Sequence, residues 1–205
     1  MVTPALAALK SALPQSRVTV LTMSAGARDL LAHDPHVDEA FHFEFPREGL
    51  FASLRFLGSL RRQRFDATVM SYPANRPEYN VIARIIGSQI RAGHRYAHLD
   101  RICFNGLNNY TVKENEDLSN IEENLRLIEL LTGEIALMTP PRVHLQNEHR
   151  AYAGAWLREH DLYGGSCIAF HPGGDLRKNH VRKRWSSERF IELGQRLACD
   201  TGATI

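Results

Sequence analysis

Apolar runs typical of strands alternate along this chain with segments of helical period. Leucines recur at helical spacing over residues 3–13, where Thr3 is a favourable N-cap and Pro4 suits the first turn. The apolar run at residues 18–23 then predicts a strand. The chain is therefore expected to open with a helix that leads directly into a strand.

The alternation continues through the first two thirds of the sequence. Further strands are expected at residues 41–45, where phenylalanines alternate, at residues 65–71 and around Ile90, and helices at residues 29–32, 50–62, 78–86 and 118–131. In the second of these helices, the leucines are expected to face the interior: Leu50, Leu54, Leu57 and Leu60. Such alternation predicts parallel strands joined by right-handed helical crossovers, a doubly wound α/β domain whose ligands bind beyond the carboxyl ends of the strands.

The pattern changes after Gly133, where a proline-containing connector leads to a helix at residues 148–160 and an apolar run at residues 167–170. We expect a domain boundary here, with residues 1–145 forming one α/β domain and residues 146–205 a linker helix and the start of a second domain. The first helix has no strand before it, and the β-prone end of the chain has no partner. We therefore expect a fragment that is truncated at both ends.

A glycine turn packed with cations follows the apolar run and precedes an amphipathic helix at residues 186–197. Gly173 and Gly174 let the backbone approach a ligand, and the helix directs free N–H groups and its positive dipole end toward the same place. The cations of the loop are Arg177, Lys178, Arg182, Lys183 and Arg184. We expect this segment to bind a diphosphate. An ordinary basic surface loop is the alternative, because the segment has neither the Walker spacing nor the GxGxxG fingerprint.

Composition narrows the class of protein. The chain has 205 residues, 43% hydrophobic and 23% charged, which is ordinary for a globular protein, and its net charge of +2 is too small to argue for nucleic-acid binding. No apolar run approaches the roughly 20 residues that span a bilayer. The three cysteines are far apart and form no CxxC pair. This favours a reducing compartment, so a cytoplasmic location is expected.

Two histidine pairs have spacings seen in metal sites, His33 with His36 and His94 with His98. Neither pair has a convincing carboxylate or cysteine complement in the sequence. We therefore interpret them as surface histidines and expect no metal site.

Several segments, taken in order, resemble glycosyltransferase family 9, the ADP-heptose:lipopolysaccharide heptosyltransferases. They are TPALAALKSALP, RVTVLT, RFDATV, the RAG after Ile90, LSNIEENLRLIELLTG, and HPGG with KRWSSERFIELGQRL. The resemblance implies a GT-B architecture of two Rossmann-like domains, the first for the acceptor and the second for the nucleotide sugar. It also implies transfer of heptose from ADP-heptose to the inner core of lipopolysaccharide, with inversion and without a metal or other cofactor.

The resemblance assigns roles to particular residues. Lys183 stands where the family places a phosphate-binding lysine, and Gly173 and Gly174 match the turn that lies against the donor phosphates. The family's base is an aspartate in a Gly-Asp motif shortly before the first helix, and only Met1 and Val2 precede Thr3. We therefore expect no catalytic residue in this chain and no transfer activity from it. The alternative function is a non-catalytic α/β remnant that retains nucleotide or anion binding.

The sequence offers fewer candidate residues for binding the acceptor than for binding the donor. Asn75 and Arg76 follow the strand at residues 65–71, and a guanidinium suits an acceptor carboxylate or phosphate. A solvated loop arginine is the alternative. The helix at residues 50–64 carries a basic outer face, which suggests peripheral contact with an anionic inner membrane, although its leucines also suit a core. Many family members have a histidine where this chain has Ser119.

Overall fold

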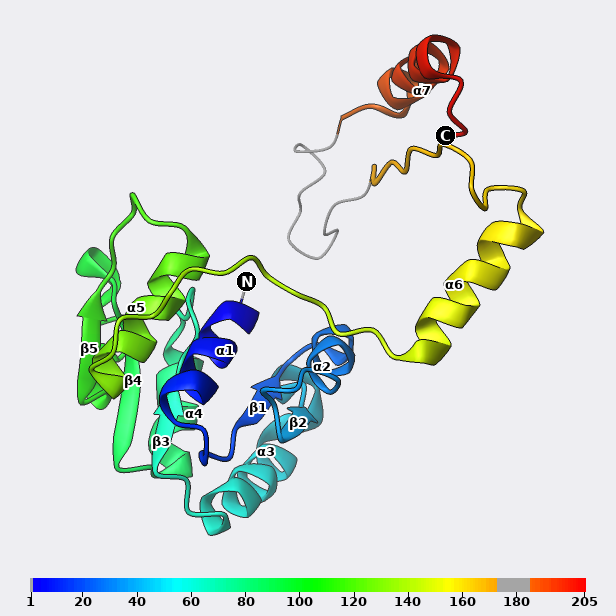
Figure 1. Cartoon of the computed structure of the whole chain (residues 1–205). Coiled ribbons are helices and arrows are strands. Elements are labelled where there is room, and N and C mark those ends of the chain that lie inside the picture. Colours follow the sequence, from blue (N-terminus) through cyan, green and yellow to red (C-terminus); the bar gives the residue numbers. More distant parts are fainter. Residues whose placement is uncertain (1, 173–184) are drawn as a thin grey trace. The chain divides into compact units, whose positions relative to one another are not determined.

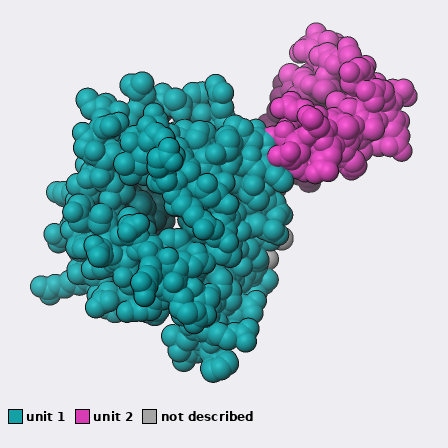
Figure 2. Space-filling model, turned by 60° about the horizontal axis from the view of Figure 1, so that its bottom comes forward, with its two compact units in different colours: residues 1–144 teal, residues 145–205 magenta. Residues whose placement is uncertain are grey.

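The structure is a computed structural model that describes residues 2–172 and 185–205. The chain divides into two compact units, Met1–His144 and Leu145–Ile205, which are coloured separately in Figure 2.

The strands of the first unit form two parallel ladders. β1 (Thr19–Thr22) pairs with β2 (Glu39–His42), and β4 (Ile90–Arg95) lies between β3 (Ala67–Val69) and β5 (Tyr110–Lys113). Every pairing is parallel, so each strand must be joined to the next by a crossover. The predicted α/β class with parallel strands is confirmed.

Helices supply these crossovers and cover both faces of the strands (Figure 1). They are α1 (Thr3–Ala12), α2 (Ala25–Leu31), α3 (Phe45–Arg62), α4 (Pro77–Ile86) and α5 (Asn120–Thr132), with short 3₁₀ turns η1 (Ala97–Leu99) and η2 (Asn105–Leu107). In β1, Val20 packs in a cluster with Leu6 and Leu31, whereas its neighbour Leu21 packs in a cluster with Leu57 and Ile86. Because adjacent strand residues point to opposite faces, α1 and α2 cover one face and α3 and α4 the other.

The interior of α3 differs from the expectation. Leu57 and Leu60 are buried, but Leu50 is 76% and Leu54 50% exposed, so the prediction that these two face the core was wrong. The buried residues of α3 are Ser53, Leu57 and Leu60, so the buried stripe passes through Ser53 and not through Leu54. Leu50 begins the helical turn that follows Gly49, whose φ of 77° interrupts the helix.

Three further expectations need correction. Thr3 is the first residue of α1 and not its N-cap, and its hydroxyl accepts a hydrogen bond from the backbone N of Arg142 at 3.2 Å. The strand expected through residues 41–45 ends at His42, and α3 begins at Phe45; Phe43 between them stacks on Phe56 of α3 with ring centroids 4.3 Å apart. β5 was not expected at all.

The second unit contains α6 (Asn147–Glu159) and α7 (Ser187–Thr201). The strand predicted at residues 167–170 is reduced to one parallel bridge between Cys167 and Thr204, in which Ile168 N donates to Thr204 O at 2.8 Å. Among the described residues only this short C-terminal stretch pairs with it. The aromatic rings of Phe170 and Phe190 lie 5.6 Å apart and join the bridge to α7.

Candidate functional site

The carboxyl ends of β3, β4 and β5 are where an α/β sheet presents its ligands. The loop after β3 carries Asn75 and Arg76, both exposed, and Arg76 is the N-cap residue of α4. The backbone O of Asn75 accepts a hydrogen bond from Cys103 Sγ at 3.0 Å. The two residues expected to contact the acceptor therefore lie together on a loop at this edge, with their side chains open to solvent.

Hydrogen bonds hold that loop to the sheet and to α5. Tyr72 N donates to Asn124 Oδ1 at 2.8 Å, Tyr72 Oη donates to Glu114 Oε1 at 2.7 Å, and Ala74 N donates to Tyr96 Oη at 2.7 Å. The hydrogen bond to Glu114, together with burial, raises the pKa of Tyr72 to about 12. Burial also raises the pKa of Tyr96. Both phenols thus stay protonated and able to donate.

Beneath the loop lies a cluster of titratable side chains that is largely closed to solvent. His94 of β4 and Glu123 of α5 are both fully buried, with Nε2 and Oε2 2.8 Å apart. Glu123 also accepts hydrogen bonds from Asn115 N at 2.6 Å and from Arg126 Nη1 at 3.0 Å. His94 had been interpreted as a surface histidine, and the structure contradicts this. The cluster gives the site edge a rigid base that joins strand, loop and helix.

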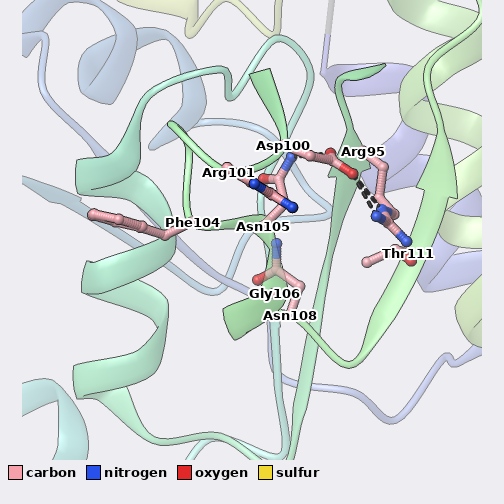
Figure 3. A pocket seen from close by; sticks show the side chains of 8 residues that line it. All are labelled: Arg95, Asp100, Arg101, Phe104, Asn105, Gly106, Asn108 and Thr111. Atoms are coloured by element: carbon pink, nitrogen blue, oxygen red, sulfur yellow. Dashed lines mark hydrogen bonds and ion pairs between the residues drawn. The ribbon is translucent and has the colours of Figure 1, made fainter. Parts of the chain in front are cut away.

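A hollow of about 440 Å³ lies nearby, between the end of β4 and the 3₁₀ turns (Figure 3). It is lined by Arg95, Asp100, Arg101, Phe104, Asn105, Gly106, Asn108 and Thr111. Arg95 and Asp100 form an ion pair, with Nη2 and Oδ2 2.6 Å apart, while Phe104 points away from it. Arg101 is exposed. The hollow therefore has one arginine held by a carboxylate and a second open to a ligand.

Asp100 organises this hollow. Its Oδ1 accepts from Tyr96 N and from Asn105 Nδ2, both at 2.8 Å, and its Oδ2 accepts from Arg95 Nε at 2.7 Å. Burial alone would raise the pKa of this carboxyl, but the hydrogen bonds from Asn105, Arg95 and Tyr96 outweigh it and hold the pKa below its usual value. Asp100 therefore remains ionised near neutral pH. The sequence analysis did not identify this hollow. The only sign of it in the sequence was the closeness of two cationic residues, Arg95 and Arg101, after the strand expected around Ile90.

The residues expected at the donor phosphates, Gly173, Gly174 and Lys183, lie outside the described residues. The structure describes the helix that follows them, and α7 begins at Ser187 with Ser186 at its N-cap. Hydrogen bonds from its own backbone N, from Ser186 and from Ser187 lower the pKa of Glu188 in the first turn. An acidic side chain near a helix N-terminus is the usual arrangement.

Comparison with known proteins identifies this fold. No protein-family model and no curated protein matches the sequence. Among solved structures, ADP-heptose LPS heptosyltransferase II of E. coli matches 97% of this chain and 57% of its own at 22% identity, with a TM-score of 0.69. A glycosyl transferase family 9 structure from Veillonella parvula DSM 2008 matches 98% of this chain and 56% of its own at 17% identity, with a TM-score of 0.75.

The chain thus spans a little more than half the length of these two structures. At such identities the likeness concerns the fold. The chain has the GT-B type of fold of a glycosyltransferase family 9 structure over nearly its whole length, as the sequence resemblance predicted.

Proposed function

We propose that the chain is part of a family 9 glycosyltransferase that transfers heptose from ADP-heptose to the inner core of lipopolysaccharide with inversion. The observation that carries the proposal is the shared fold with a heptosyltransferase over 97% of the chain, together with the family's motifs in their order along the sequence. A fold by itself hosts many activities, so the motifs are needed to select this one.

In this proposal residues 1–145 bind the acceptor. Asn75 and Arg76 are exposed on a loop whose backbone is held by the hydrogen bonds that Tyr72 N and Ala74 N donate, so a ligand meets these side chains on a fixed backbone. Arg76 would pair with an acidic group of the acceptor, since its planar fork suits carboxylate and phosphate. Preorganisation of the loop lowers the entropy that binding must overcome.

Residues 146–205 would bind the nucleotide sugar. Lys183 would stabilise the negative charge that develops on ADP as it leaves, with Gly173 and Gly174 letting the backbone approach the phosphates. The following helix α7, with its N-cap at Ser186, would add its positive end to the same anion.

Titration calorimetry with ADP tests the donor part of this proposal. Lys183→Ala should weaken ADP binding about 5- to 150-fold, because a charge-assisted hydrogen bond contributes about 1–3 kcal/mol. The matched control is Lys113→Ala, which removes an exposed lysine of the first unit. Equal affinities of the two variants would move the donor site elsewhere. Gain of one heptose by heptose-deficient lipopolysaccharide, followed by mass spectrometry, tests transfer by the whole glycosyltransferase of which the chain is proposed to be part.

A membrane contact through α3 is part of the proposal. Leu50, Phe51 and Leu54 are exposed by 76%, 83% and 50%, and Arg55 and Arg62 are exposed on the same helix. Apolar side chains flanked by arginines suit the surface of an anionic bilayer. Within residues 2–172 and 185–205, no helix has the length and apolar character needed to cross a membrane.

Co-sedimentation with phosphatidylglycerol vesicles tests this contact. Arg55→Glu with Arg62→Glu should reduce vesicle binding, with phosphatidylcholine vesicles as the uncharged control. Arg61 is left unchanged because its Nη1 donates to Ile85 O at 2.9 Å. Binding that is unchanged by the charge reversal would remove α3 from the membrane surface.

A further inference from the structure

The turn between α2 and β2 holds a carboxylate whose bonding is incomplete. The Asp34 side chain is only 2% exposed, and its Oδ1 accepts a hydrogen bond from His36 N at 2.9 Å and lies 2.8 Å from His36 Nδ1. Its Oδ2 is also buried and has no hydrogen-bond partner among the described residues. Because an unpaired buried carboxylate oxygen is costly, this oxygen calls for a cationic or protonated partner.

A second histidine reaches the same place from far along the chain. One ligand atom from each of Asp34, His36 and His144 lies within 4.8 Å of the others. The two imidazole rings meet edge to face, with centroids 6.3 Å apart and an interplanar angle of 73°. Both histidines are partly exposed, so an ion has a path from solvent.

We propose that Asp34, His36 and His144 bind a divalent transition-metal ion, with zinc as the representative case. One carboxylate and two imidazoles form a borderline ligand set that suits zinc, cobalt or nickel better than calcium or magnesium. With zinc bonds of about 2.0–2.2 Å the three ligand atoms must draw closer, which the half-buried rings allow by side-chain rotation. Water would fill the fourth tetrahedral position.

The site has a structural role. It lies on the turn that leads into the amino end of β2, whereas the candidate functional site lies at the carboxyl ends of β3, β4 and β5. His144 is the last residue of the first unit, and two positions earlier Arg142 N donates to Thr3 Oγ1. A metal held by His144 and Asp34 would thus fasten the connector to the first unit. The sequence had given the His33–His36 pair no carboxylate complement, and Asp34 supplies one.

Zinc titration of the full chain tests the site. Because Cys167 and Cys199 are exposed and thiols bind zinc, the titration uses the background Cys167→Ser with Cys199→Ser at neutral pH. One zinc ion should bind per chain, and His36→Ala or His144→Ala should each weaken it at least tenfold. Asp34→Asn should do the same while leaving an oxygen to accept from His36 N.

The matched control is His160→Ala, which removes a histidine of the second unit whose Nδ1 lies 2.8 Å from Trp156 O. It should leave zinc affinity unchanged. Equal affinities of His144→Ala, His36→Ala and the control would overturn the site.

Trypsin cleavage supplies a readout that does not depend on affinity. Zinc should slow cleavage after Arg142, in the connector, relative to cleavage after Arg150 in α6 of the same chain, and His144→Ala should abolish this protection. An unchanged ratio of the two cleavage rates on adding zinc would show that the connector is not fastened by the metal.

Discussion

His94 on β4 and Glu123 on α5 meet in the interior of the first unit, with Nε2 and Oε2 2.8 Å apart and both side chains fully buried. The contact is a close approach and not an aligned hydrogen bond, since neither ring nitrogen of His94 has a hydrogen-bond partner among the described residues. The Tyr72 ring packs against His94, with centroids 5.1 Å apart. The loop that carries Asn75 and Arg76 therefore rests directly on this pair.

Glu123→Ala should be among the more destabilising substitutions in the first unit. It would leave Asn115 N without its acceptor and Arg126 Nη1 with only Lys113 O, and removal of one partner from a buried ion pair typically costs about 3–5 kcal/mol. Urea unfolding of the full chain measures the loss. Glu116→Ala, at an exposed glutamate, is the control and should change stability by no more than about 0.5 kcal/mol. Similar midpoints for the two variants would mean that Glu123 is not holding α5 to the strands.

Stability should fall as the pH drops below about 6.5, because of His94. Burial lowers the pKa of His94 below the ordinary value of 6.5, and the attraction of Glu123 only partly offsets this. Below 6.5 the unfolded chain binds a proton that the folded chain does not, so the equilibrium shifts toward unfolding. His94→Gln should flatten the pH dependence of the unfolding free energy between about pH 7 and 5.5, whereas His160→Ala should keep it. An identical slope in His94→Gln would exclude His94 as its source.

The long helices could be predicted from sequence because their signals are redundant. The helix expected at residues 118–131 is α5 at Asn120–Thr132, where apolar periodicity, a capping serine and a C-terminal glycine agree. β5 gave no such signal. Its four residues show weak alternation and lie among polar residues, so only its pairing with β4 defines it. The strand predicted at residues 167–170 had the right composition, but a strand also requires a partner.

The candidate functional site was also only partly predictable, because some of its features depend on neighbouring strands and not on local sequence. The position of Asn75 and Arg76 follows from the rule that loops after parallel strands gather at one edge. The burial of His94 does not follow from local sequence, because β4 is the central strand of its sheet and Ala92, Gly93 and His94 are buried in succession. Both faces of such a strand are covered, which removes the alternation that distinguishes inside from outside. The exposure of Leu50 and Leu54 likewise did not follow from their helical spacing with Leu57 and Leu60, because Ser53 occupies the buried stripe at that turn.

Gly93 should not tolerate a methyl group. A Cβ there would lie 2.9 Å from Asn108 Nδ2 and 3.2 Å from Met70 Cε. Asn108 Nδ2 also donates to Asn80 Oδ1 at 2.9 Å, so a displaced Asn108 would lose a hydrogen bond. Gly93→Ala should cost about 1–3 kcal/mol in thermal or urea unfolding. Gly106→Ala is the control, because a Cβ there meets nothing within 4 Å. If Gly93→Ala unfolds like this control, the packing around β4 is looser than described.

Ser119 caps α5, and its removal should weaken the first unit. Its hydroxyl accepts from Glu122 N at 3.3 Å and its own N donates to Glu122 Oε2 at 2.8 Å, which is a capping box. Ser119→Ala should cost about 1 kcal/mol in urea unfolding, and Ser119→Asp, which preserves a capping oxygen, should restore most of it.

The Ser119 hydrogen bonds also lower the pKa of Glu122 below 4.5. The contribution of the capping box is therefore fully present above pH 4.5 and is lost as the pH falls through the lowered value. The gap in stability between wild type and Ser119→Ala should narrow accordingly in acid. A gap that stays constant down to about pH 3 would show that the Ser119 hydroxyl does not stabilise the Glu122 carboxylate.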